Sequence, residues 1–178
     1  MKEMKDYTIP FVGLKVGQHK YDFSLDKKFF EHFEYDEFHQ ADIKLEVVLD
    51  KKPNMLEIEL TFEGSVNVSC DRTNEPFDLP ISGEYHFVVK FGEETDDMQD
   101  ELLILPHGAY QVNIQQQVYE SIVLALPSKR IHPGIAEGTL KSEVLDQLEA
   151  LKPKGAKQNH LEDVDPRWDD LKKLLTDK

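Results

Sequence analysis

The fold is decided by two stretches of alternating sequence, IKLEVVL at residues 43–49 and LEIELTFE at residues 56–63. Apolar residues at every second position share one face of a β-strand, so each stretch predicts a strand with one buried and one solvated face. Lys52-Pro53-Asn54 lies between the two stretches and suits a turn. The two stretches are therefore predicted to form an antiparallel pair.

The same alternation continues on both sides of Gly64 and runs through residues 66–70, which predicts one long strand. The glycine is expected to permit a bend or a bulge in it. A third alternating run follows at residues 85–91, and a short apolar strand is predicted at residues 102–105. These runs predict a curved, mainly antiparallel sheet, for which barrel-like closure is an open alternative.

Two helices are predicted beside this sheet. Residues 27–33 fit a short helix with Asp26 as its N-cap. From Val112 the apolar period becomes helical, and a helix over residues 112–126 is predicted to pack on the sheet and to end at Pro127. The fold class is therefore α+β.

Three further segments carry weaker signals. Residues 9–14 and 19–24 are predicted to be the two strands of an N-terminal hairpin. The acidic segment 92–101 indicates a solvated loop, and residues 128–139, which contain Pro133, Gly134 and Gly138, indicate a connector.

The C-terminal part of the chain is predicted to be helical. Residues 140–151 show an amphipathic period, and residues 152–159 form a polar break. Asp165-Pro166 then marks the start of another helix, because the aspartate suits the N-cap and the proline suits the first helical position.

The charge of the chain limits its partners. The 178 residues carry a formal net charge of −14, and residues 1–139 hold 26 acidic and 13 basic residues. Affinity for nucleic acid comes largely from Lys and Arg side chains that displace counterions from phosphates. Weak or no binding to naked nucleic acid is therefore expected.

No segment reaches the run of about 18 apolar residues that a membrane span needs, so no membrane partner is expected. The first residues, MKEMKDY, lack the apolar core of a signal peptide. The chain is therefore expected to stay in the cytoplasm.

A search for catalytic motifs gives little. Neither a glycine-rich nucleotide loop nor the Gly-x-Ser-x-Gly pattern occurs, so no cofactor is expected. Cys70 is the single cysteine, which leaves no intrachain disulfide and no multi-cysteine zinc site. With a histidine as base, Cys70 would be a nucleophile, but free cysteines are among the most buried residues and a core position is favoured.

Three of these segments resemble the YceD family, also called the large ribosomal RNA subunit accumulation proteins. The segments are Cys70-Asp71-Arg72-Thr73 after the long strand, the strand at 103–106, and VYESIVLALP at residues 118–127. His132 also fits. The resemblance covers roughly residues 40–135, and Asp-Pro-Arg-Trp at residues 165–168 is similar to the C-terminal tail of such proteins.

The resemblance implies a non-enzymatic factor that supports large-subunit ribosomal RNA accumulation and ribosome assembly. Residues 1–139 would form a YceD-like α+β domain, and residues 140–178 a helical C-terminal extension with a polar linker. Because an acidic body attracts Lys- and Arg-rich molecules, the expected partners are ribosomal proteins or preribosomal particles. A different class stays open, a small cytoplasmic enzyme that uses Cys70 or a histidine–carboxylate pair.

The candidate binding residues come from the matched motifs, and no catalytic or metal-binding residue is carried over. They are Cys70, Arg72, Glu120, Arg167 and Trp168. Arg72 either binds a carboxylate or phosphate or pairs within its turn with Asp71 or Glu75. Trp168 either packs on its own domain or docks in a partner's groove. Many relatives resemble Cys-x-Arg-Cys at this turn, whereas this chain has Thr73, which puts a role for paired thiols in doubt.

Overall fold

The structure is a computed structural model that describes residues 5–93, 96–99 and 101–151. Among the described residues, those up to Leu140 form one compact unit, and residues 141–151 belong to a second. None of the helices in the described residues has the length and apolar content that a membrane span requires. Along the chain the elements are η1 (Lys5–Tyr7), β1 (Thr8–Pro10), β2 (Gly17–Asp26), α1 (Lys27–Glu31), β3 (Gln40–Lys51), β4 (Met55–Ser69), β5 (Pro76–Gly92), β6 (Asp96–Gln99), β7 (Leu102–Pro106), β8 (Gln111–Asn113), α2 (Gln115–Leu124), α3 (Pro133–Glu137) and α4 (Glu143–Leu151).

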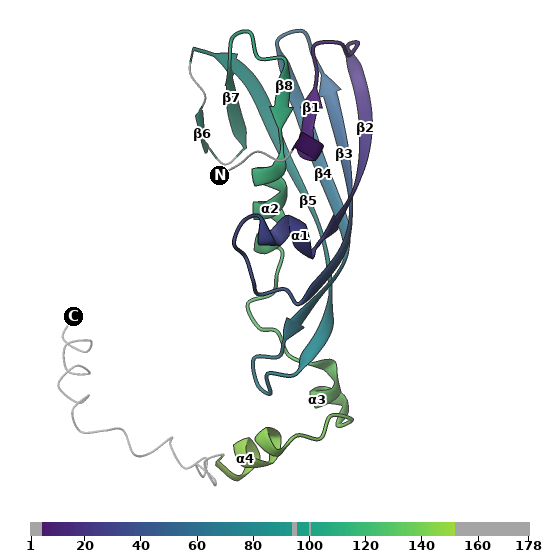
Figure 1. The fold of residues 1–178 in the computed structure, drawn as a ribbon, viewed down its shortest axis with the longest axis vertical. Helices are drawn as coiled ribbons and strands as arrows, with labels where there is room; N and C mark the ends of the chain where they lie inside the picture. Colours follow the sequence, from purple (N-terminus) through teal and green to yellow (C-terminus); the bar gives the residue numbers. More distant parts are fainter. Residues whose placement is uncertain (1–4, 94–95, 100, 152–178) are drawn as a thin grey trace, which may run out of the picture. The chain divides into compact units, whose positions relative to one another are not determined.

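The main sheet has the strand order β2-β3-β4-β5-β7-β6. Its neighbours are antiparallel except for β5 and β7, which run parallel. Figure 1 shows β2 to β5 as long, curved strands lying side by side. The predicted curved, mainly antiparallel sheet is confirmed. It is open, with β2 and β6 at its edges, and is not closed into a barrel.

The predicted central pair is formed by β3 and β4. Leu45 lies opposite Phe62 and Leu49 lies opposite Ile58, and all four side chains are buried. The alternate residues of both strands, on the opposite face, point away from this core and are exposed or half-buried. The alternation in the sequence therefore predicted both the pairing and the buried face.

Gly64 sits where three strands come close together. Pairing passes through it without a shift in register, with Ile43 of β3 on one side and Ile81 of β5 on the other. A Cβ atom at position 64 would lie 2.2 Å from the Asp42 carbonyl oxygen. The glycine is thus required by close approach of the neighbouring backbone, and β4 has no bulge there.

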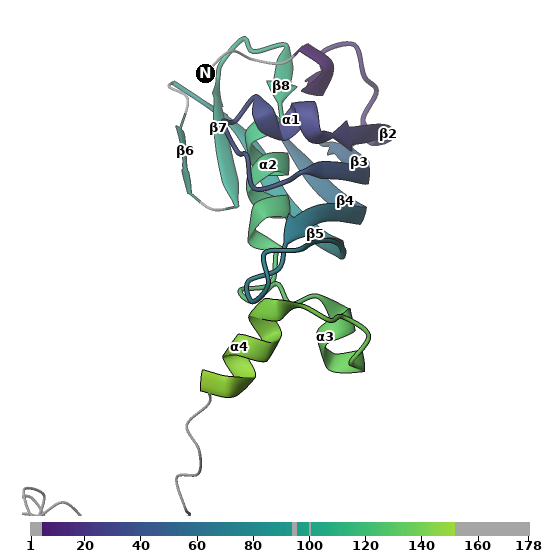
Figure 2. The same ribbon diagram turned by 60° about the horizontal axis from the view of Figure 1, so that its bottom comes forward.

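Helices α1 and α2 lie on the same side of strands β2 to β5 (Figures 1 and 2). Asp26 caps α1 as predicted, because its Oδ1 accepts the Lys28 backbone N–H at 3.0 Å. Phe33, in the turn that follows α1, stacks on Tyr119 of α2 with 4.2 Å between ring centroids. Phe30 and Phe38 fill the core beneath them and are fully buried.

The predicted N-terminal hairpin is wrong. Strand β1 pairs with β8, with Ile9 opposite Val112, while β2 pairs with β3. Ile9 and Val112 are both buried, so this small second sheet contributes to the core. Adjacent extended segments favour a hairpin, but here burial of Ile9 is achieved with a strand about one hundred residues away.

The helix predicted over residues 112–126 begins later than expected. Val112 belongs to β8, and α2 starts only at Gln115. Asn113 separates the two elements, since its Oδ1 accepts the Gln115 backbone N–H at 3.0 Å. Val118 and Ile122 of α2 are buried, so the predicted packing of this helix in the core is confirmed.

Three weaker predictions also need correction. The segment 92–101, predicted to be a loop, contains the edge strand β6, which pairs with β7. A polar sequence can form such a strand because an edge strand pairs with one neighbour only. The connector at 128–139 contains α3. The second amphipathic helix starts at Glu143, because Leu140 still donates its N–H to the Gly134 carbonyl of α3. The helix predicted from Asp165 lies outside the described residues.

The alternate positions of β2 to β5 that point away from the core form what we call the outward face. All of its charged side chains are exposed or half-buried. The outward face carries the acids Asp22, Asp26, Asp42, Glu46, Asp50, Glu57, Glu59, Glu63, Asp78 and Glu84 and the lysines Lys20, Lys44 and Lys90.

Candidate functional site

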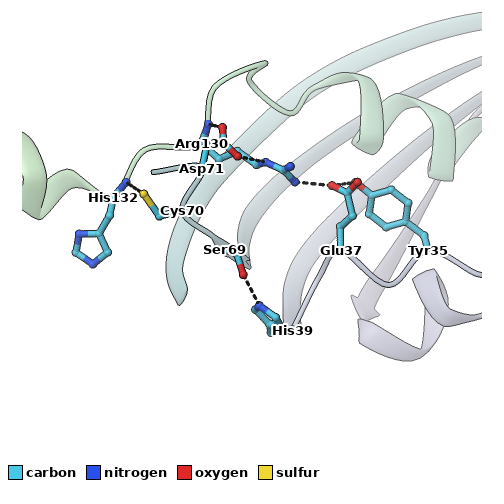
Figure 3. A network of polar contacts seen from close by, with 8 residues as sticks. All are labelled: Tyr35, Glu37, His39, Ser69, Cys70, Asp71, Arg130 and His132. Atoms are coloured by element: carbon cyan, nitrogen blue, oxygen red, sulfur yellow. Dashed lines mark hydrogen bonds and ion pairs between the residues drawn. The ribbon is translucent and has the colours of Figure 1, made fainter. Parts of the chain in front are cut away.

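The turn Cys70–Thr73 follows directly after β4 and meets the segment that follows α2 (Figure 3). The Asp71 backbone N–H donates to the Arg130 carbonyl oxygen at 2.8 Å. In return, the Arg130 backbone N–H donates to Asp71 Oδ2 at 2.7 Å. These reciprocal bonds fix the path of the chain after α2 against the end of the sheet.

The Arg130 side chain ties a third segment to this junction. Its Nη1 donates to Glu37 Oε2, and its Nε lies 3.6 Å from Asp71 Oδ1. The hydrogen bond to Glu37 outweighs desolvation and, with the charges of Glu37 and Asp71, raises the pKa of Arg130. Tyr35 also donates to Glu37 Oε2, at 3.2 Å, and burial together with the Glu37 charge raises the pKa of Tyr35 to about 12. The guanidinium of Arg130 is thus engaged in contacts within the protein.

Cys70 is buried at the same junction, with 3% of its surface exposed, which confirms the core position expected for it. The His132 backbone N–H donates to Cys70 Sγ at 3.3 Å. Burial raises the pKa of the Cys70 thiol, but hydrogen bonds from the His132 backbone and the Thr73 side chain and backbone lower it overall. Thr73 is itself buried, and its side chain hydrogen-bonds to the thiol. Thr73 stands at the position where the family resemblance would place a second cysteine.

The His132 ring caps the N-terminus of α3. Its Nδ1 accepts the Gly134 backbone N–H at 3.0 Å, and the ring lies 5.4 Å from that of Phe77. His39 bonds Ser69 through its Nε2 at 3.0 Å. In the described part of the chain, neither imidazole hydrogen-bonds to the Cys70 sulfur. The geometry is that of a thiol used in packing, since a nucleophile would need a base within hydrogen-bond reach.

The described residues contain no group of three or more His, Cys, Asp and Glu side chains arranged to hold a metal ion. The carboxylates of the junction are directed at Arg130. Its chemistry is therefore that of a structural clasp joining three distant segments of the chain.

The described candidate residues, Cys70, Arg72 and Glu120, do not converge on one site. Arg72 shares the turn with Cys70 and is exposed, and no described residue pairs with its guanidinium. Asp71, one of its expected turn partners, pairs with Arg130 instead. Glu120 is exposed on α2 and accepts a hydrogen bond from Gln116. Arg167 and Trp168 lie outside the described residues.

Sequence reasoning missed Arg130 and Glu37. Arg130 comes just after the helix-ending Pro127, where a charged residue is unremarkable, and Glu37 stands 93 residues earlier. No local spacing connects residues so far apart. The matched turn at Cys70–Thr73 and His132 pointed toward this part of the fold, but not toward these two residues.

The fold and the junction define an α+β protein built on an open, curved antiparallel sheet, with the segment after its main helix clasped to the sheet end. A family model described as "Large ribosomal RNA subunit accumulation protein YceD" matches residues 58–175. The chain therefore belongs to the YceD family, as its motifs predicted. No curated protein matches the chain, and no solved structure does.

Proposed function

We propose that this protein is a non-enzymatic cytoplasmic factor that supports large-subunit ribosomal RNA accumulation by binding basic ribosomal proteins or assembly intermediates. Membership of the YceD family supports the connection with large-subunit ribosomal RNA. The choice of a protein partner in place of naked RNA is our own and rests on charge.

The observation that carries the proposal is the uncompensated negative charge of the first unit. Acidic residues outnumber basic ones by 26 to 13 in residues 1–139. Several of the bases are also engaged internally. The Lys51 ammonium donates to the carbonyls of Phe11 and Leu14 at 2.8 and 2.9 Å, and Arg130 is held by two carboxylates.

Such a surface is poorly suited to a phosphate backbone. Binding of RNA gains free energy when Lys and Arg release counterions, and here few free cations oppose many free carboxylates. The same field attracts Lys- and Arg-rich proteins and speeds their encounter at low ionic strength. Ribosomal proteins and assembly intermediates with exposed basic segments have the required charge.

Affinity capture of the full chain from growing cells, followed by mass spectrometry, tests the proposal. Enrichment of large-subunit ribosomal proteins after nuclease treatment is expected, because the contact is to protein. In parallel, gel-shift titration with naked ribosomal RNA at physiological salt should show weak binding. Submicromolar affinity for the RNA, or loss of the captured proteins after nuclease treatment, would contradict the proposal.

One observation favours a second function, an enzyme that uses Cys70, because hydrogen bonds lower the pKa of this thiol. The thiol is nevertheless buried, and its donors from His132 are backbone atoms. Reactive cysteines are usually accessible to solvent. The binding role is therefore the better supported of the two.

A further inference from the structure

We propose that the outward face of β2 to β5 is the docking surface for a lysine- and arginine-rich polypeptide segment of the partner. This inference rests on the proposed function, since it assigns a place on the fold to the binding of a basic protein. The outward face holds ten acidic residues and three lysines, a higher ratio of acids to bases than the 26 to 13 of residues 1–139 as a whole.

The strand register places acidic residues directly opposite one another on the outward face. Asp22 lies opposite Glu46, Asp26 opposite Asp42, and Asp50 opposite Glu57. Like charges at directly opposed positions of an antiparallel pair are destabilising. Asp26 has a folding role as the N-cap of α1, and Glu46 and Glu57 have lysine partners. The opposite member of each pair, Asp22, Asp42 or Asp50, forms no ion pair in the described residues, and a cationic partner would neutralise it.

The described residues compensate this negative charge in part: Lys44 lies opposite Glu63, Asp26 accepts the Lys28 backbone N–H, and Asp78 accepts a hydrogen bond from Asn67. In the part of the chain that the structure describes, Glu46 and Glu57 are the two of the ten that form ion pairs, with Lys20 and Lys52. Asp22, Glu46 and Glu63 line an open depression on the outward face together with Lys44, so the carboxylates there outnumber the ammonium groups by three to one. A guanidinium or ammonium group placed there would meet several carboxylates at once.

The arrangement favours an extended basic segment over a metal ion. Side chains of a sheet face stand side by side and do not converge, and no described cluster is arranged to hold a metal. Asp42, Glu46 and Asp50 follow one another at every fourth residue of β3. At a rise of about 3.3 Å per residue they span roughly 26 Å, which an extended peptide of about 12 residues covers.

The decisive variant is Asp22→Asn/Asp42→Asn/Asp50→Asn, which removes one carboxylate from each opposed pair. The control is Glu93→Gln/Glu101→Gln/Glu137→Gln, which removes three exposed carboxylates elsewhere and changes the net charge equally. Full-length proteins are titrated into a fluorescent arginine- and glycine-rich peptide of about 12 residues. The face variant is expected to bind about 3- to 10-fold more weakly than wild type and the control within about twofold, because exposed ion pairs are individually weak.

Equal losses in the two variants, or a larger loss in the control, would overturn the docking surface while leaving the proposed function standing. If the wild-type chain captures large-subunit proteins but ignores the peptide, docking of a basic segment is overturned. If it does neither, the proposed function fails with it. Backbone amide shifts of the wild-type protein during peptide titration give an independent readout, and changes confined to residues outside β2 to β5 would also refute the assignment.

Discussion

Removing one member of each opposed acidic pair should make the fold more stable while it weakens binding. The triple variant Asp22→Asn/Asp42→Asn/Asp50→Asn leaves the partner of each pair in place. The ion pairs of Glu46 and Glu57 are therefore kept. The Asp26 cap of α1 is kept as well. What the substitutions remove is chiefly repulsion.

The size of the gain follows from the register. Like charges at directly opposed positions cost about 0.2–1 kcal/mol per pair, so relief at three pairs is worth roughly 0.6–3 kcal/mol. Lys44 lies two residues from Asp42 along β3 and attracts it, which reduces the gain. We expect an increase of about 1 kcal/mol in the free energy of unfolding.

Urea unfolding followed by circular dichroism measures this gain at low ionic strength and again near 1 M NaCl. The Debye length falls to about 3 Å at 1 M salt, so the advantage of the face variant should largely disappear there. The control variant carries the same net charge and reports the general effect of making the protein less acidic. A face variant no more stable than this control at low salt, or a gain unchanged at high salt, would refute the reasoning.

Three further predictions concern the fold and the junction. Gly64→Ala should lower the free energy of unfolding by about 3 kcal/mol, since the added Cβ would meet the neighbouring backbone. As a control in the same urea assay, Gly13→Ala, whose Cβ would have open space around it, should lie within about 0.5 kcal/mol of wild type. Equal effects of the two substitutions would contradict the close approach at Gly64. Arg130→Met keeps the aliphatic stem of the side chain but loses both ion pairs, so the free energy of unfolding should fall by about 1 kcal/mol in thermal or urea unfolding. No change would show that the hydrogen bonds of the Asp71 and Arg130 backbones hold the junction without the guanidinium. Alkylation of native Cys70 by iodoacetamide should be slow and should accelerate with sub-denaturing urea; fast modification without denaturant would favour the enzyme alternative.

The central sheet was predictable because its signal is local. The period of two along β3 and β4 predicts which face of each strand is buried. The short polar turn between the two strands predicts that they pair with each other. The cap of α1 was predictable for the same reason, since Asp26 acts on the N–H two residues later. Each of these inferences needs only a few neighbouring residues.

The errors arose where the partner of a segment is distant or the segment is short. Ile9 finds its partner strand at Val112, and nothing in the hexapeptide around Ile9 distinguishes that pairing from a hairpin with the next strand. Val112 itself fits the helical period of the residues after it, and a three-residue strand is too short to show a period of two. The Arg130–Glu37 contact joins residues 93 apart and was invisible for the same reason.

The junction and the outward face differ in whether their charged side chains find partners of opposite charge within the protein. This difference is the basis for assigning a folding role to the junction and proposing a binding role for the outward face. At the junction, carboxylates and guanidinium are paired within the protein, so its polar residues already have a purpose in holding distant segments together. On the outward face, the register sets carboxylates against carboxylates, which costs stability. A sequence that departs from favourable local pairing without an internal compensation is expected to do so at functional sites. We therefore expect the compensating cation to come from outside the fold, as in the proposed docking of a basic polypeptide.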